Sequence, residues 1–314
     1  MNERKNNIVI FLMGPTASNK TKLAIKLNKI LPIDLISVDS GLVYKELNIG
    51  TAKPNADELK RAPHKLINII SITDNYCVNS FRRDALFEIK NSISNNRIPF
   101  LVGGTMFYYS SLINGLSILP SRNDIIRKLI LSKFSLNSSN NLYKQLMIID
   151  PISALKIHPN DLQRILRALE VYYLSGKKIS DLTKFKNNNF PYKTLKFVIF
   201  PKNKKILHKK IEYRLRKMLS CGFQEEVENI SSKVFFNKSI PGMKCVGYKN
   251  MYNYILGKIS YKDMFYQTLI STKKLAKNQM TWLKKFKNCF FLDSEKLNFS
   301  IDFIYKIINE FFNK

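Results

Sequence analysis

The sequence is poor in the residues that cross-link small domains or bind metal ions through sulfur and imidazole. Of its 314 residues only four are cysteines, which form no CxxC pair, and only three are histidines, none at zinc-finger spacing. This scarcity argues against a disulfide framework and against a zinc site. With its thiols reduced, the protein is expected in the cytoplasm.

Long apolar runs are also missing. No stretch approaches the roughly 20 apolar residues that a membrane-spanning helix needs. Residues 1–7 are polar, and the apolar run Ile8–Met13 is too short to be the core of a signal peptide. We therefore expect no association with a membrane.

Acidic residues are few compared with basic ones. The sequence has 23 Asp and Glu against 52 Lys and Arg, a formal net charge of +29. A polyanionic partner such as a nucleic acid would explain this excess, because basic groups neutralise phosphates. A solvated coat of lysines would explain it equally, so composition alone leaves both explanations open.

Short apolar runs alternate with helical patterns over residues 1–116. Each helical stretch repeats apolar residues at intervals of three and four. The alternation predicts a parallel sheet covered by helices on both faces. The expected strands are Ile8–Met13, Leu35–Val38, Leu66–Ile70 and Pro99–Val102, and the expected helices are Lys20–Ile30, a helix that Asn79 caps and that runs to about Ser94, and Met106–Ile113.

The pattern changes after about Leu116. Helical patterns then follow one another without a strand until the short apolar run Phe197–Phe200. We therefore expect an all-helical insertion domain at 117–192, between two parts of the core at 1–116 and 193–314. The expected helices of the insertion are Ile125–Phe134, Leu142–Ile149, Pro151–Ile157 and Asp161–Leu174.

The turn after the first expected strand matches a phosphate-binding loop. The P-loop pattern GxxxxGK[ST] joins a strand to a helix, and its backbone N–H groups and the positive end of the helix point at phosphate oxygens. The match predicts a P-loop NTPase-like α/β fold with a site for a diphosphate. The matching residues are Gly14, Pro15, Thr16, Ala17, Ser18, Asn19, Lys20 and Thr21.

Three positions of this loop carry specific expectations. Lys20 supplies a positive charge to a phosphate, and the Thr21 hydroxyl is placed to ligate Mg²⁺. Asn19 stands where the pattern has its second glycine. Asn is among the few residues besides glycine that tolerate left-handed backbone angles, so the substitution is compatible with the loop.

Two further groups fall at the same expected edge of the sheet. Asp39 ends the second strand, and Gly103-Gly104-Thr105 ends the strand Pro99–Val102. Ligands of open α/β sheets bind at this carboxyl edge. Asp39 is therefore a candidate Mg²⁺ ligand, general base or helix cap, and the glycine turn is either a tight turn or a substrate-facing loop.

Eight segments together resemble the bacterial tRNA dimethylallyltransferase (tRNA isopentenyltransferase) family. They occur in one order along nearly the whole chain, although each alone is weak evidence. The resemblance implies transfer of a dimethylallyl group from dimethylallyl diphosphate to N6 of adenosine 37 in tRNA, with Mg²⁺ as cofactor and diphosphate as product. The segments are GPTASNKT (14–21), LISVDS (35–40), IGTAKP (49–54), FRRDAL (81–86), LVGGT (101–105), HPNDLQRILRALE (158–170), CVGY (245–248) and LAKNQMTWL (275–283).

The resemblance also implies roles for individual residues. The donor diphosphate would lie on the loop 14–21, Asp39 would take the N6 proton, and Arg214 would lie near the diphosphate. Thr105 would contact the target nucleotide. The residues that match tRNA-contacting positions are Asp39, Ser40, Gly41, Leu42, Thr105, Arg127, Gln163, Arg164, Ile165, Leu166, Arg167, Lys244, Cys245, Val246, Gly247, Tyr248 and Lys249. Lys244 and Lys249 stand where relatives often have arginine, which would make a bidentate phosphate contact that lysine cannot.

Two segments present polar or basic side chains that are candidates for contact with a nucleic acid. In Asp161–Leu174 one face carries Gln163, Arg164, Arg167 and Glu170, and the other carries Leu162, Ile165, Leu166, Leu169, Tyr172 and Tyr173. With the resemblance, this polar face is expected to bind the anticodon stem-loop of tRNA. Five lysines near Trp282 either follow phosphates or keep the surface soluble; they are Lys273, Lys274, Lys277, Lys284 and Lys285.

Two other functions fit the phosphate-binding loop. A P-loop kinase would bind ATP and phosphorylate a small metabolite or nucleoside. A basic RNA-binding protein with a decayed P-loop would bind tRNA and form no product. In either case, and for the transferase, we expect a monomer.

Overall fold

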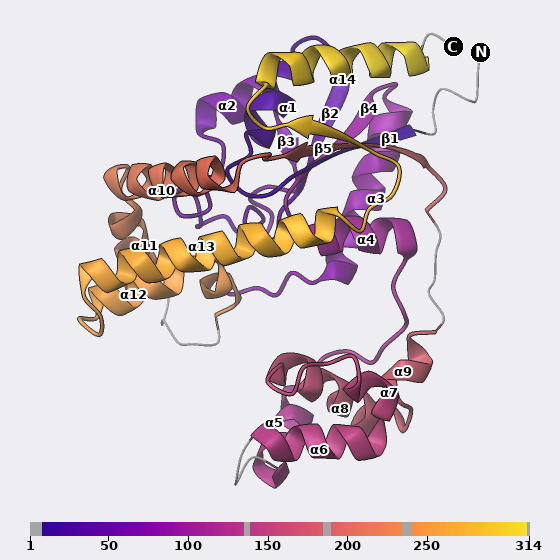
Figure 1. Ribbon diagram of the computed structural model, residues 1–314, viewed down its shortest axis with the longest axis vertical. Helices are drawn as coiled ribbons and strands as arrows, with labels where there is room; N and C mark the ends of the chain where they lie inside the picture. Colours follow the sequence, from indigo (N-terminus) through magenta and orange to yellow (C-terminus); the bar gives the residue numbers. More distant parts are fainter. Residues whose placement is uncertain (1–7, 135–138, 185–189, 234–239, 313–314) are drawn as a thin grey trace. The chain divides into compact units, whose positions relative to one another are not determined.

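The computed structural model describes residues 8–134, 139–184, 190–233 and 240–312 (Figure 1). The chain forms two compact units, residues 1–110 with 191–314 and residues 111–190. The N-terminal segment 1–7, considered above as a possible signal sequence, lies outside the described residues. No helix in the described ranges has the length and apolar character needed to cross a bilayer.

A six-stranded parallel sheet forms the centre of the first unit. Its strand order is β3-β2-β4-β1-β5-β6, and every neighbouring pair is parallel. The order confirms the predicted α/β class and places β1 and β4, whose twelve residues are all buried, in the middle. The strands are β1 (Ile8–Met13), β2 (Ile33–Val38), β3 (His64–Lys65), β4 (Ile98–Gly103), β5 (Lys193–Phe200) and β6 (Cys289–Asp293).

Helices cover both faces of this sheet. On one face α1 (Lys20–Asn28) and α14 (Leu297–Phe312) pack against alternate residues of β1, β2, β4 and β5. On the other face α3 (Val78–Ser94) contacts β2 and β4, and Figure 1 shows it across the sheet from α14. Burial on both faces explains why the central strands read as continuous apolar runs rather than as alternating patterns.

The first unit contains further helices besides these three. A separate apolar core joins the loop residues Val43, Tyr44 and Leu47 to α11 and α12. The long helix α13 packs along α10. The helices are α2 (Ala56–Arg61), α4 (Met106–Asn114), α10 (Lys204–Ser220), α11 (Phe223–Lys233), α12 (Tyr248–Ile255) and α13 (Tyr261–Leu283).

In its described residues, the second unit contains helices and no strand. Its core is formed by the buried side chains Ile130, Leu142, Leu146, Ile165 and Leu169. This agrees with the helical content predicted for the insertion. Its helices are α5 (Asp124–Phe134), α6 (Ser139–Ile149), α7 (Pro151–Ala154), α8 (Leu162–Ser175) and α9 (Ile179–Leu182).

Three local predictions were wrong. The expected strand Leu66–Ile70 does not form, because Leu66 and Asn68 adopt positive φ angles of 62° and 58°. The two residues before it form the short strand β3, and Ile70 makes an isolated bridge to Tyr44. Asn79 lies inside α3, whose N-cap is Cys77. The helix expected at Pro151–Ile157 ends at Ala154.

The two-faced pattern predicted for α8 was also wrong in part. Glu170, expected on the polar face, is fully buried. Leu162 and Tyr173, expected on the apolar face, are 46% and 40% exposed. The buried face of α8 is therefore centred on Ile165 and Leu169.

Candidate active site at the carboxyl edge of the sheet

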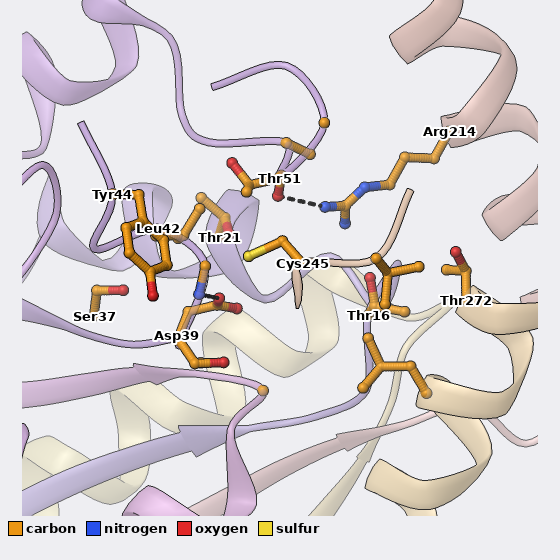
Figure 2. Close-up of a pocket in the computed structure, with 18 of the residues that line it drawn as sticks. Thr16, Thr21, Ser37, Asp39, Leu42, Tyr44, Thr51, Arg214, Cys245 and Thr272 are labelled. Atoms are coloured by element: carbon orange, nitrogen blue, oxygen red, sulfur yellow. Dashed lines mark hydrogen bonds between the residues drawn. The ribbon is translucent and has the colours of Figure 1, made fainter. Parts of the chain in front are cut away.

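A cavity of about 480 Å³ lies in the first unit, where β1, β2 and β4 end. Its lining joins segments that are far apart in the sequence, and Figure 2 shows their side chains directed toward one another. The structure thus brings Thr16, Lys20, Thr21 and Arg214 of the expected donor site together in one place, whereas the other residues of the loop 14–21 do not line the cavity. From the expected site residues, the lining includes Thr16, Lys20, Thr21, Asp39, Ser40, Gly41, Leu42, Arg214, Lys244, Cys245 and Val246.

The backbone of the loop 14–21 explains its residue types. A side chain at Gly14 would lie 2.7 Å from the carbonyl oxygen of Ile199, so only glycine fits there. Asn19 has φ 65°, the left-handed conformation that its motif position requires. Ala17 also has a positive φ of 60°, which is unusual for alanine. Ser18 is buried, and its hydroxyl donates to the carbonyl of Pro15 at 2.8 Å.

Lys20 lies beside the cavity without a carboxylate partner among its hydrogen bonds. Its Nζ donates to the carbonyl of Pro15 at 2.6 Å and to the Ser18 hydroxyl at 3.4 Å. Burial lowers the pKa of Lys20 to about 7; Asp39 raises it and Arg214 lowers it further. A phosphate in the cavity would restore the charge that burial disfavours.

One N–H group of the loop is bound by a residue that no sequence motif singled out. The N–H of Thr16 donates to Gln279 Oε1 at 2.9 Å, and Gln279 Nε2 donates to the carbonyl of Gly104 at 2.8 Å. One side chain of α13 therefore connects the P-loop to the turn after β4. The only sequence signal for Gln279 was its place in the segment 275–283.

Asp39 follows β2 and points into the cavity (Figure 2). Its Oδ1 accepts the N–H of Gly41 at 2.8 Å, which fixes the carboxylate at the start of the loop. The Thr105 hydroxyl accepts the N–H of Ser40 at 3.1 Å, so Thr105 supports this loop from the end of β4. A side chain at Gly103 would lie 2.0 Å from the carbonyl oxygen of Val38, and this close approach of two strand ends requires glycine.

Arg214 reaches the opposite side of the cavity from α10. Its Nη2 donates to the carbonyl of Thr51 at 3.1 Å (Figure 2). Burial lowers the pKa of Arg214 and Asp39 partly offsets this, but a guanidinium stays charged. The loop carrying Thr51 is held by Glu226 of α11, which accepts the N–H groups of Asn48, Ile49 and Gly50.

The segment 244–249 is divided between the cavity and the core. Cys245 lies near Asp39 in Figure 2, and burial, with Asp39, raises the pKa of its thiol to about 12, so the thiol stays protonated. Tyr248 is fully buried and donates to Glu226 at 2.6 Å. Gly247 has φ 96°, and Lys249 is exposed. Only the first three residues of this segment line the cavity.

The expected tRNA-binding residues of the second unit fall into two groups. Gln163 and Arg164 are exposed, whereas Ile165 is fully buried and Leu166 is partly buried against the core. Arg127 and Arg167 form ion pairs with the buried carboxylate of Glu170 at 3.0 and 2.6 Å. The side chain of Ile165 is thus not available to a ligand, and both arginines have a structural role within this unit.

Comparison with known proteins gives consistent matches. The family model of IPP transferases matches residues 42–286. The tRNA dimethylallyltransferase of Buchnera aphidicola subsp. Acyrthosiphon pisum (strain APS) is 50% identical over 285 residues, which are 91% of this chain and 90% of that protein.

Solved structures of two similar proteins share the fold. The crystal structure of tRNA delta(2)-isopentenylpyrophosphate transferase from Staphylococcus epidermidis matches with a TM-score of 0.70 and 31% identity, covering 97% of this chain and 99% of that one. A eukaryotic dimethylallyltransferase acting on tRNA matches with a TM-score of 0.78 and 26% identity, covering 96% of this chain and 80% of that one.

Proposed function

This chain belongs to the IPP transferase family, and from that premise we propose that it transfers a dimethylallyl group from dimethylallyl diphosphate to N6 of adenosine 37 in tRNA. One observation carries the proposal at the level of residues. The P-loop, Asp39 and Arg214 line a single cavity in the first unit. This arrangement supports a diphosphate site beside the carboxylate that would take the proton.

The reaction divides naturally between the two sides of this cavity. The bond between C1 of the allyl group and the diphosphate oxygen breaks, and its electron pair leaves with the diphosphate. Lys20 and Arg214 bind the leaving group and stabilise the negative charge that develops on it. The N6 lone pair forms the new bond to C1, and the N6 proton passes to the carboxylate of Asp39.

A magnesium ion fits the chemistry of these side chains. The Thr21 hydroxyl and the Asp39 carboxylate both face the cavity, and Mg²⁺ prefers oxygen ligands shared with substrate phosphates. We propose that Thr21 would hold it, together with Asp39 either directly or through water. When bound, the ion would neutralise charge on the diphosphate.

The tRNA would meet both units of the protein. Lys244 and the loop Asp39–Leu42 surround the cavity and would contact the target nucleotide. Gln163 and Arg164 on α8 are the exposed residues that would contact the anticodon stem-loop. We further propose that the protein acts as a monomer in the cytoplasm, where its substrate is found.

A single incubation separates this function from the alternatives. Unmodified tRNA is mixed with the protein, Mg²⁺ and either dimethylallyl diphosphate or ATP, and the nucleosides are then analysed by mass. We expect adenosine to gain one dimethylallyl group only with the allylic donor. Consumption of ATP with phosphorylation of a nucleoside would favour a kinase, and binding without any product would favour an RNA-binding protein with an inactive P-loop.

A further inference from the structure

Two buried polar atoms in the cavity have no hydrogen-bond partner among the described residues. They are the hydroxyl oxygen of Ser37, a residue that is 3% exposed, and Nε2 of His64. Both residues line the same cavity as Asp39. Buried polar groups are nearly always hydrogen-bonded, so a pair of unsatisfied atoms facing a cavity points to a ligand that supplies the missing partners.

The chemistry of this pair is defined by the surroundings of His64. Its Nδ1 lies 2.7 Å from the carbonyl oxygen of Ala62, which can only accept, so Nδ1 carries the proton and Nε2 is a bare acceptor. Burial lowers the pKa of His64, which keeps the ring neutral. Ser37 can donate or accept. A ligand that fits this pair therefore offers an N–H or O–H donor to His64 and a polar atom to Ser37.

The order of the strands places His64, on β3, beyond the strand of Ser37 and Asp39 as seen from the P-loop. Along the carboxyl edge, the P-loop follows β1, Thr105 follows β4 and Asp39 follows β2, whereas His64 begins β3 opposite Leu35, four residues before Asp39. Ser37 precedes Asp39 by two residues, so both side chains leave the same face of the strand. An attacking amine approaches C1 from the side opposite the leaving diphosphate. The ring that carries the amine would then extend from Asp39 toward β3.

We propose that Ser37 and His64 form a subsite that reads the purine ring of the target nucleotide next to its reacting amine. The inference rests on the proposed function. His64 Nε2 accepts the amine N–H that Asp39 does not take, and the Ser37 hydroxyl donates to the neighbouring ring nitrogen. A purine with a carbonyl in place of the amine sets its oxygen against the acceptors of both His64 and Asp39, so the subsite selects adenine by rejecting oxopurines.

The contact of Ser37 is tested with altered anticodon stem-loops. The full-length protein is assayed with loops that carry adenosine, 1-deazaadenosine or 7-deazaadenosine at position 37. With the wild type, one of the two deaza loops should lose about tenfold in kcat/KM, the effect of one hydrogen bond. In Ser37→Ala, the kcat/KM for the adenosine loop should be about tenfold lower than in the wild type. Changing adenosine to that deaza nucleoside should then lower the kcat/KM of the variant no further.

Ser92→Ala is the matched control for this experiment. Ser92 is equally buried, but its hydroxyl donates to Glu88 within α3, away from the cavity. This variant should keep the wild-type response to both deaza loops. Equal responses of Ser37→Ala and Ser92→Ala would overturn the assignment of Ser37.

The contact of His64 is tested through selectivity. A stem-loop with inosine at position 37 serves as a competitive inhibitor of the reaction. Discrimination is measured as the ratio of the inhibition constant of the inosine loop to the KM for the adenosine loop. This ratio should be about tenfold lower in His64→Ala than in the wild type, while the KM for dimethylallyl diphosphate stays unchanged. His64→Gln, which keeps an acceptor, should restore most of the discrimination.

The outcomes separate this inference from the function on which it rests. A wild-type protein that forms no alkylated adenosine contradicts the proposed function, and the subsite falls with it. An active protein in which Ser37→Ala and His64→Ala keep the rate and the selectivity of the wild type contradicts the subsite alone. Thermal melting of each variant identifies a change that is due to unfolding.

Discussion

At the scale of single residues, the amine of Lys20 should make diphosphate binding depend on pH. Its pKa is lowered to about 7, so at pH 8 most of the free protein has a neutral Lys20. A bound diphosphate favours the charged form. Binding of diphosphate at pH 8 should therefore take up close to one proton, and the affinity should fall as the pH rises above about 7.

Calorimetry in buffers of different ionisation enthalpy measures this proton uptake. Lys20→Met is the control, and it should bind diphosphate more weakly and without the uptake assigned to Lys20. Equal proton uptake by the wild type and Lys20→Met would show that the amine is already charged before the ligand binds.

Gln279 provides a second prediction at this scale. Its two hydrogen bonds, to Thr16 and Gly104, hold the P-loop in place before the donor arrives. Each such bond contributes about 1 kcal/mol net. Gln279→Ala should raise the KM for dimethylallyl diphosphate roughly five- to tenfold and change kcat less. Hydrogen exchange of the peptide containing residues 14–21 should become faster.

The control for this variant is Gln224→Ala. Gln224 donates to Glu228 on α11 and does not line the cavity. It should leave the donor KM and the exchange of the P-loop unchanged. An unaltered P-loop in Gln279→Ala would mean that the glutamine does not position it.

These residues also show what a sequence can and cannot predict about a site. The P-loop was predictable because its conformation depends on neighbouring residues, including Asn19 in its left-handed conformation. Gln279 lies 263 residues from its partner Thr16, and Glu226 lies 178 residues from Asn48. No local pattern specifies such contacts, because they arise only when the helices pack on the sheet edge.

At the scale of elements, the ion-pair group between α5 and α8 should stabilise the second unit. Burial by itself would raise the pKa of Glu170, but hydrogen bonds from Arg127 and Arg167 outweigh it and lower the pKa to about 2. Glu170→Gln leaves two arginines without their carboxylate, which should cost about 3–5 kcal/mol of unfolding free energy.

The same group determines the response of this unit to acid. Because the folded pKa lies below the ordinary value of 4.5, the contribution of Glu170 is present above that pH and is lost as the pH falls toward about 2. Denaturant unfolding at pH 7 and pH 3 measures the loss. Asp181→Asn, which removes an exposed ion pair with Lys184, is the control and should change little. A Glu170→Gln variant with wild-type stability at pH 7 would contradict the structural role of the group.

Secondary structure was predictable where burial and periodicity agree. The strand Ile8–Met13 was predicted with its observed ends, because a short apolar run that ends at a glycine turn indicates a buried strand. The run 66–70 is also apolar except for Asn68, yet Leu66 and Asn68 take left-handed angles that hydrophobicity does not reveal. Glu170 was misplaced because the helical pattern assigns charged residues to the surface unless their partners are known.

At the scale of the whole molecule, the net charge of +29 should make tRNA binding strongly dependent on salt. The lysines of the segment near Trp282 are mostly exposed, and Lys285 lies over the Trp282 ring at 5.2 Å. Replacing Lys274, Lys277 and Lys284 by Gln should reduce the slope of log affinity against log salt by about 0.7 for each tRNA phosphate that these lysines neutralise in the wild type.

The control for this experiment replaces three exposed lysines elsewhere, Lys22, Lys90 and Lys306. Both triple variants lose the same total charge, so a local contact is distinguished from a general electrostatic effect. Equal salt slopes for the two variants would mean that the lysines near Trp282 serve solubility rather than tRNA binding.

The central claim is that Asp39 accepts the proton of the amine while the P-loop holds the donor. The most direct test is the turnover of Asp39→Asn, which keeps an oxygen for the N–H of Gly41 but loses the base. We predict a loss of about 10²- to 10⁴-fold in kcat with unchanged affinity for tRNA, whereas Asp74→Asn, outside the cavity, should turn over normally. Near-normal turnover by Asp39→Asn would contradict the account.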